Sequence, residues 1–248
     1  MRAKLSVLTA VLLIAASATA YAADAVKATL SQGLIHINNQ EARPGKEYGV
    51  LNYKNHIYVP IRYVSERLGA FAGYDPAAKA VYIDGRPALQ SNLKSAQSAS
   101  DANGDFKLRL FADKTKYASG EPLTVWSRIE RTGQEPLTIM HAPALIHFYI
   151  EDESGYRETE ARVLSALTST IKPDDDWLSL MPPHLIVQYN ARKANAGDLE
   201  AYLAREPRPA VLPAGTYRIG AIAEYGIGKL TPGNAQKKLT AEITVTID

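Results

Sequence analysis

Alternating hydrophobic and polar residues run through most of the C-terminal part of the chain. The segments 106–111, 123–129 and 239–247 alternate between apolar and polar side chains, with Ser127 as the exception on the apolar side, which is the pattern of a strand with one buried face. Turn residues, such as the Gly-Glu-Pro at 120–122, separate these segments. Short alternating strands with turns between them are typical of a β-sandwich, so we expect residues 105–248 to form one.

The segment 158–210 is too long to be one connection in a minimal sandwich. Its last part predicts a short helix at 198–203, with Asp198 as the N-cap. We therefore interpret 158–210 as an insertion in the sandwich. An insertion on a rigid scaffold is a frequent place for binding residues.

The N-terminal part of the chain predicts a smaller unit with one helix. This helix is expected to begin at Pro60, where the missing N–H costs nothing, and to end at Gly69. Its apolar stripe of Ile61, Val64 and Leu68 should pack on a small antiparallel sheet. The strands predicted for this sheet are residues 34–38, 55–59, 70–74 and 80–83, with a turn at 38–39.

The motif around this helix resembles a known family. The sequence IYVPIRYVSERLGA at 57–70, followed by Tyr-Asp at 74–75 and VYI at 81–83, resembles the stalk domain, also called the copper amine oxidase N-terminal-like domain. Two positions depart from the family pattern, because Ile61 stands for Leu and Tyr74 for Trp.

The stalk resemblance implies a small α+β domain over residues 24–85, with one helix on an antiparallel sheet. Such domains are accessory modules of exported bacterial cell-surface proteins. The matched motif also implies that Arg62 ties the helix to a neighbouring carbonyl group. It implies no copper and no other cofactor, because the metal and quinone of the oxidases lie in another domain.

The C-terminal part carries a second resemblance. The segments YASGEPLT at 117–124, RTGQEPLTI at 131–139 and PAGTY at 213–217 resemble bacterial immunoglobulin-like domains. Among these, they are similar to the domain named after the Bacillus intracellular proteinase inhibitor. The resemblance implies an immunoglobulin-like β-sandwich for residues 105–248, and it makes inhibition of a proteinase an alternative function.

A polar segment of small residues separates the two predicted domains. Between residues 90 and 104 the only large apolar side chain is that of Leu93. A segment of this composition buries too little apolar surface to order itself. We therefore predict a linker at 86–104, and a mainly β protein of two domains.

The N-terminus has the pattern of a secretory signal peptide. Basic residues at its start precede an apolar run at 5–16 and an Ala-Tyr-Ala cleavage site at 20–22. The apolar run is shorter than the roughly 20 residues that a membrane-spanning helix needs. We expect residues 1–22 to be removed, which predicts a secreted, extracellular or cell-wall-associated protein with no transmembrane segment.

Charge and cysteine content narrow the possible functions. Residues 1–22 contain two basic and no acidic residues, so the chain without them carries 26 of each. A balanced charge gives no electrostatic reason to bind nucleic acid. The chain has no cysteine, which excludes disulfides, thiol catalysis and cysteine-bound zinc.

Candidate binding residues lie in the insertion, which is richer in apolar and aromatic side chains than an ordinary connecting loop. They are Trp177, Met181, His184 and Tyr189. Apolar and aromatic side chains with polar neighbours are typical anchors of a binding surface. If the insertion instead folds back over the sandwich, the same side chains become part of its core, and both arrangements remain open.

Asp174 and Asp176 are candidate ligands of a hard cation, because carboxylate oxygens are the groups that such cations prefer. They belong to a run of three aspartates that lacks the ligand spacing and the glycine of an EF-hand loop. A solvated turn after Pro173 is therefore the alternative interpretation.

No catalytic motif is present in the sequence. It contains neither the Gly-x-Ser-x-Gly of a nucleophile elbow nor the His-Glu-x-x-His of a zinc hydrolase. We therefore expect a non-catalytic module of the cell envelope that binds a wall polymer, a surface protein or a peptide. The alternatives are a proteinase inhibitor and an accessory domain of a hydrolase system.

Overall fold

A computed structural model describes residues 26–37, 40–45, 47–85, 93–161, 165–228 and 236–248. The predicted signal peptide and the predicted turn at 38–39 lie outside these residues. The chain divides into two compact units, with the boundary between Pro60 and Ile61. This boundary falls inside the segment 24–85, and each unit is described by itself.

The first unit contains two small antiparallel sheets. One joins β1 (Thr29–Leu30), β4 (Leu51–Tyr53) and β5 (His56–Tyr58), and the other joins β2 (Ile35–Ile37) and β3 (Gln40–Ala42). Lys54 and Asn55 connect β4 to β5 with positive φ angles of 49° and 61°. Two successive positive φ angles are the geometry of a tight hairpin turn, and here they form the two-residue loop between Tyr53 and His56.

The second unit begins with α2 (Ile61–Arg67) and a hairpin of β6 (Phe71–Asp75) and β7 (Ala80–Asp84). The helix begins at Ile61, one residue after the start predicted at Pro60, and as predicted Gly69 adopts a left-handed φ of 75° just after its end. The Nε of Arg62 donates to the carbonyl oxygen of Ala72 at 3.3 Å, so the predicted tie between helix and neighbouring backbone is confirmed.

Two predictions for this region are wrong. The described strands between residues 26 and 85 form three separate sheets and not one, because strands of two to five residues offer few backbone hydrogen bonds. The predicted apolar stripe of α2 is also not its buried face. Ile61 and Leu68 are 47% and 58% exposed, whereas Tyr63 and Ser65 are the residues that α2 buries.

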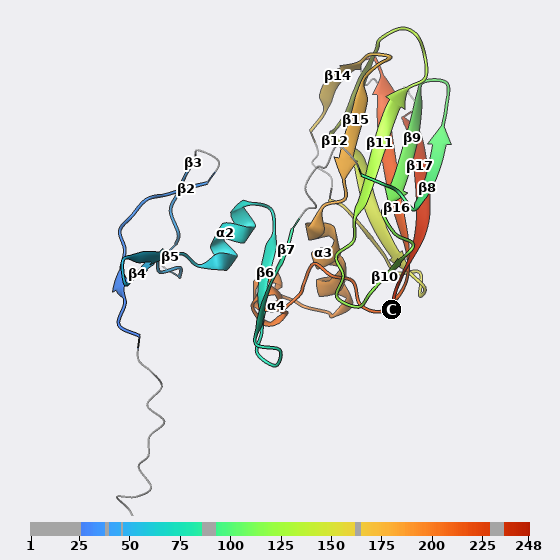
Figure 1. The fold of residues 1–248 in the computed structure, drawn as a ribbon. Helices are drawn as coiled ribbons and strands as arrows, with labels where there is room; N and C mark the ends of the chain where they lie inside the picture. Colours follow the sequence, from blue (N-terminus) through green and yellow to red (C-terminus); the bar gives the residue numbers. More distant parts are fainter. Residues whose placement is uncertain (1–25, 38–39, 46, 86–92, 162–164, 229–235) are drawn as a thin grey trace, which may run out of the picture. The chain divides into compact units, whose positions relative to one another are not determined.

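The rest of the second unit contains two larger sheets, which Figure 1 shows as adjacent layers. The four-stranded sheet has the order β15 (Asp176–Leu180), β11 (Val125–Arg131), β9 (Phe106–Ala112) and β8 (Gln97–Ala102). The six-stranded sheet has the order β10 (Lys116–Tyr117), β17 (Lys237–Ile247), β16 (Gly215–Ile227), β12 (Leu137–Asp152) and β13 (Arg157–Thr159), and β14 (Leu167–Ile171) also pairs with β12. The described strands pair antiparallel, except that β10 and β17 are parallel.

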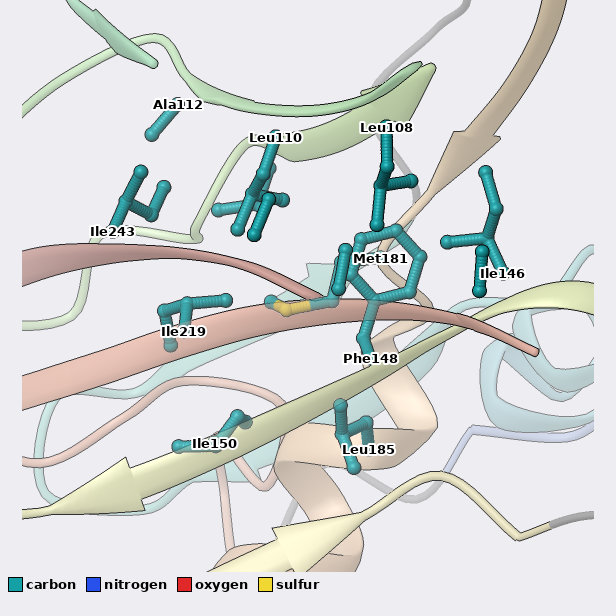
Figure 2. Packing of buried hydrophobic residues seen from close by; sticks show 14 of the residues in the cluster. Leu108, Leu110, Ala112, Ile146, Phe148, Ile150, Met181, Leu185, Ile219 and Ile243 are labelled. Atoms are coloured by element: carbon teal, nitrogen blue, oxygen red, sulfur yellow. The ribbon is translucent and has the colours of Figure 1, made fainter. Parts of the chain in front are cut away.

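The two larger sheets share one hydrophobic core, as the sequence predicts for a sandwich. Strand β9 alternates strictly between buried and half-buried side chains, and its inward residues include Leu108 and Leu110. They pack with Phe148 of β12, Ile219 of β16 and Ile243 of β17 (Figure 2). The mainly β fold class is confirmed.

Part of the predicted linker is ordered, because residues 97–102 form the edge strand β8 beside β9. Ala99 packs against the core, and the Gln97 amide donates to the Thr244 carbonyl oxygen at 2.9 Å. The Asp101 carboxylate accepts a hydrogen bond from the Thr240 backbone N–H at 2.9 Å. Backbone pairing and polar side-chain bonds therefore order a segment with little apolar surface. Residues 86–92 of the predicted linker lie outside the described residues.

The insertion contains β13, β14, β15 and two helices, α3 (Pro183–Lys193) and α4 (Leu199–Arg205). The predicted helix α4 is confirmed, and the Asp198 carboxylate caps it by accepting from the Glu200 backbone N–H at 2.9 Å. The helix α3 was not predicted. Within the described residues, no helix is long and apolar enough to cross a membrane.

Candidate functional site

The insertion folds back onto the sandwich and completes its core. Met181, just before α3, and Leu185, in its first turn, belong to the hydrophobic core cluster (Figure 2). Met181 is 5% exposed and Tyr189 is 3% exposed. The prediction that Met181 and Tyr189 lie on an exposed binding surface is therefore wrong. Both side chains are buried, because the insertion's helix α3 packs against the core.

Trp177 also contributes to the core. It lies on β15 opposite Ile129 of β11, is half-buried, and packs against the core residues. Its ring meets that of His141 edge to face, with 6.0 Å between centroids. The exposed Trp177 that the sequence analysis considered as an anchor is thus not found, since a strand pairing turns this side chain toward the core.

His184 remains accessible, with its side chain 45% exposed in the first turn of α3. Its Nε2 lies 3.8 Å from Oε1 of Glu160. It lines a cavity of about 430 Å³, whose other walls are Pro183 and residues 66–71 at the end of α2.

The two aspartates predicted as cation ligands do not form a metal centre. Asp176 makes an ion pair with Arg128 of the adjacent strand β11, and Asp174 is exposed in the turn before β15. In the part of the chain that the structure describes, no three potential ligand side chains come together to hold a metal. The position of Asp174 matches the alternative interpretation as a solvated turn.

A second cavity, of about 810 Å³, lies beside α3 and α4. Its walls are the turn at 152–154, the C-terminal half of α3, helix α4, the segment 206–217 and the turn at 119–120. Tyr189, one of the predicted binding residues, lines this cavity. The cavity combines tyrosine rings, aliphatic side chains and charged groups.

Asp152 holds one wall of this cavity together. Its Oδ2 accepts hydrogen bonds from the Tyr189 hydroxyl and the Lys193 ammonium, both at 2.7 Å. Its Oδ1 accepts from the backbone N–H groups of Ser154 and Tyr156, at 2.9 and 3.1 Å. Burial alone would raise the pKa of Asp152, but these donors outweigh burial and hold the pKa far below its usual value.

Burial and the same hydrogen bonds raise the pKa of the neighbouring tyrosine, and the hydrogen bonds fix its ring. Burial, and then the hydrogen bond to Asp152, raise the pKa of Tyr189. Its ring meets that of Tyr217 edge to face at 5.8 Å, and the Tyr217 hydroxyl donates to the Pro213 carbonyl oxygen at 3.0 Å. Both rings are therefore fixed in position at neutral pH, with their hydroxyl groups protonated.

Asn190 fixes another part of the cavity wall. Its side-chain amide donates to the carbonyl oxygens of Pro209 and Val211, at 2.9 and 2.8 Å. These bonds hold the segment before β16 against α3. Because buried backbone carbonyls need a donor, one asparagine positions the loop that forms much of the cavity.

Arg208 joins this loop to the β6–β7 hairpin. Its guanidinium donates to both oxygens of Asp84, at 2.6 and 3.2 Å, and lies 4.5 Å from the centre of the Tyr82 ring. The contact is close, since a Cβ on Gly73 would come within 1.9 Å of the Pro207 carbonyl oxygen. Glycine at position 73 thus permits the hairpin to pack against residues 207–208.

Two acidic side chains complete the cavity lining. Glu153 is exposed, and Glu206 is half-buried at the end of α4. Burial, and then the charge of Glu206, raise the pKa of Tyr202 to about 12. Glu206 therefore lies close enough to influence a tyrosine that also faces the cavity.

Sequence reasoning missed most of these residues. It named Tyr189 and the N-cap of α4, but it gave no role to Asp152, Asn190 or Arg208. No protein-family model matches the chain, and no curated protein matches its sequence.

Proposed function

We propose that this chain is an exported, non-catalytic binding protein of the cell envelope, and that the cavity beside α3 and α4 is its binding site. The signal-peptide pattern at residues 1–22 and the stalk resemblance at 24–85 support export and a place at the cell surface. The observation that carries the binding role is the cavity itself.

The size and lining of this cavity suit a ligand. Binding cavities are typically about 300–1,000 Å³, mostly apolar, with a few fixed polar groups. Here Tyr189 and Tyr217 are held in place by Asp152 and by the loop before β16. Rigid aromatic walls lose little conformational entropy when a ligand binds.

The state of Asp152 favours binding over catalysis. A general acid or base needs a pKa near the pH at which it acts, and a free position for the substrate. The pKa of Asp152 is held far below its usual value, and its two oxygens already accept from Tyr189, Lys193 and Ser154. This carboxylate supports the cavity wall.

A blocking substitution tests the proposal. Ala214 is exposed and lines the cavity, so Ala214→Trp should fill part of it without disturbing the core. Ala144→Trp is the matched control, because Ala144 is also exposed but lies within β12, away from the cavity. The probe is purified cell-wall material from the source organism, with bound protein measured by sedimentation. We expect A214W to lose binding and A144W to retain it, and equal binding by both would contradict the proposal.

A further inference from the structure

The charged side chains that line the cavity differ in whether they are free to bind a ligand. Its two basic residues are both bonded to carboxylates, Lys193 to Asp152 at 2.7 Å and Arg208 to Asp84 at 2.6 Å. Each base is therefore neutralised by a neighbour within the fold.

The two remaining acidic residues of the lining are not neutralised in this way. For Glu153 and Glu206, the described residues provide no ion pair, and one oxygen of Glu206 accepts only a long hydrogen bond of 3.4 Å from the Arg208 backbone N–H. The charges left for a ligand are thus both negative, and a positive group is their electrostatic complement.

The other walls favour a cation on an apolar stem. Pro213 and Ala214 are exposed and provide apolar surface, and Tyr202 contributes a half-buried ring beside Glu206. A lysine side chain has a four-carbon apolar stem and a charged head, and it buries the stem while the head stays with polar groups. The face of a tyrosine ring also attracts an ammonium group.

Resting on the proposed function, we propose that the cavity binds a lysine side chain of a peptide, with its ammonium group at the carboxylates of Glu153 and Glu206. The stem packs along Tyr202 and the aliphatic wall. An amino sugar carries the same charge, but its ring is polar on most sides and matches the apolar wall less well.

The test is calorimetric titration of the full chain with the blocked peptide acetyl-Gly-Lys-Gly-amide at low salt. The same peptide acetylated on the lysine side chain keeps the stem and removes the charge. We expect the charged peptide to bind and the acetylated peptide to bind at least tenfold more weakly, since a charge-assisted hydrogen bond contributes about 1.5–3 kcal/mol, or roughly 10- to 100-fold.

Matched variants locate the binding. Glu206→Gln and Glu153→Gln should each weaken the charged peptide roughly tenfold. Glu135→Gln, in an exposed loop outside the cavity lining, should leave the affinity unchanged. Unchanged affinity in both cavity variants overturns the proposal. So does an equal affinity of the acetylated peptide, or binding of a glucosamine tetramer in place of the peptide.

The two proposals can fail separately. If E206Q and E153Q bind cell-wall material as the unmodified chain does, while A214W does not, the cavity is the binding site and the lysine assignment is wrong. If A214W also binds normally, the cavity itself is not the site, and both proposals are wrong.

Discussion

The core between the two large sheets and the cavity beside α3 both contain tyrosines, and Tyr225 of the core differs from Tyr202 of the cavity in its hydrogen bonds. Tyr189 and Tyr217, which also line the cavity, are hydrogen-bonded as Tyr225 is. In the core, the Tyr225 hydroxyl bonds to Asp105 at 3.0 Å and to the Asn103 side chain, and its ring meets Phe106 edge to face at 4.9 Å. At the cavity, Tyr202 is half-buried, and its hydroxyl has no hydrogen-bond partner among the described residues.

The difference indicates which tyrosines stabilise the fold and which can bind a ligand. Groups whose hydrogen bonds are complete stabilise the fold, and their removal leaves partners unsatisfied. Groups that face a cavity without such partners contribute little to the fold and remain available to a ligand. Substitutions in the first class should change the free energy of unfolding, and those in the second class should change binding.

The largest effect is expected for a core leucine on α3. Leu185 is fully buried, so Leu185→Ala should lower the free energy of unfolding by roughly 3–5 kcal/mol through lost burial and a new void. Leu199 on α4 is 45% exposed, and Leu199→Ala should change it by less than about 0.5 kcal/mol. Denaturant unfolding measures both. Similar losses in the two variants would contradict the assignment of α3 to the core.

The next effect concerns a cavity residue that is committed to the fold. Arg208→Ala leaves the carboxylate of Asp84, which is buried, without its partner. The expected loss of unfolding free energy is roughly 3 kcal/mol. The exposed pair of Arg43 and Glu41 provides the comparison, since Arg43→Ala should cost less than about 1 kcal/mol. A loss of unfolding free energy at Arg208 as small as that at Arg43 would contradict the structural role of its ion pair with Asp84.

Asp152→Asn should lower the free energy of unfolding by about 2 kcal/mol at neutral pH, because the donors around it lose an ionised acceptor. The folded state holds the pKa of Asp152 below the unfolded value of about 3.9. Its stabilisation is therefore complete above that pH and is lost as the pH falls toward the folded-state pKa. The difference in melting temperature between the two proteins should shrink below about pH 4. A constant difference would show that charge is not the cause.

The smallest effect is expected for Tyr202→Phe, which should change the free energy of unfolding by less than about 0.5 kcal/mol at neutral pH. Because the folded state raises the pKa of Tyr202 to about 12, its contribution is complete below the unfolded pKa of about 10 and is lost as the pH rises to the folded value. The variant lacks this loss. It should gain stability relative to the unmodified chain between about pH 10 and 12, as unfolding curves over this range would measure. A stability difference that stays constant over this range would contradict the raised pKa of Tyr202.

The sequence predicted those parts of the fold that depend on local pattern. Alternation located β9, β11 and β17, because these strands have one face toward a common core. Local signals also located the start of α2 after Pro60 and the cap at Asp198. Helix α3 was missed because its N-cap and first residue are the Pro-Pro pair at 182–183 and no side chain caps it.

The cavity depends on contacts that local pattern does not contain. Asp152, Asn190 and Arg208 lie on three segments that are far apart in sequence, and only the packing of α3 and α4 brings them together. Edge strand β8 escaped prediction for a similar reason, since its order depends on bonds to Thr240 and Thr244 of β17. Both features depend on tertiary hydrogen bonds between polar side chains and distant backbone.

Amide hydrogen exchange, with and without soluble fragments of purified cell wall, tests most directly that the cavity is the binding site. The account predicts that these fragments slow exchange in the C-terminal half of α3, in α4 and in the segment 206–217, which form the cavity walls. Exchange in β9 and β11, which belong to the four-stranded sheet and do not line the cavity, should stay unchanged. Slower exchange confined to β9, β11 or the strands before Pro60, with none around the cavity, would contradict the account.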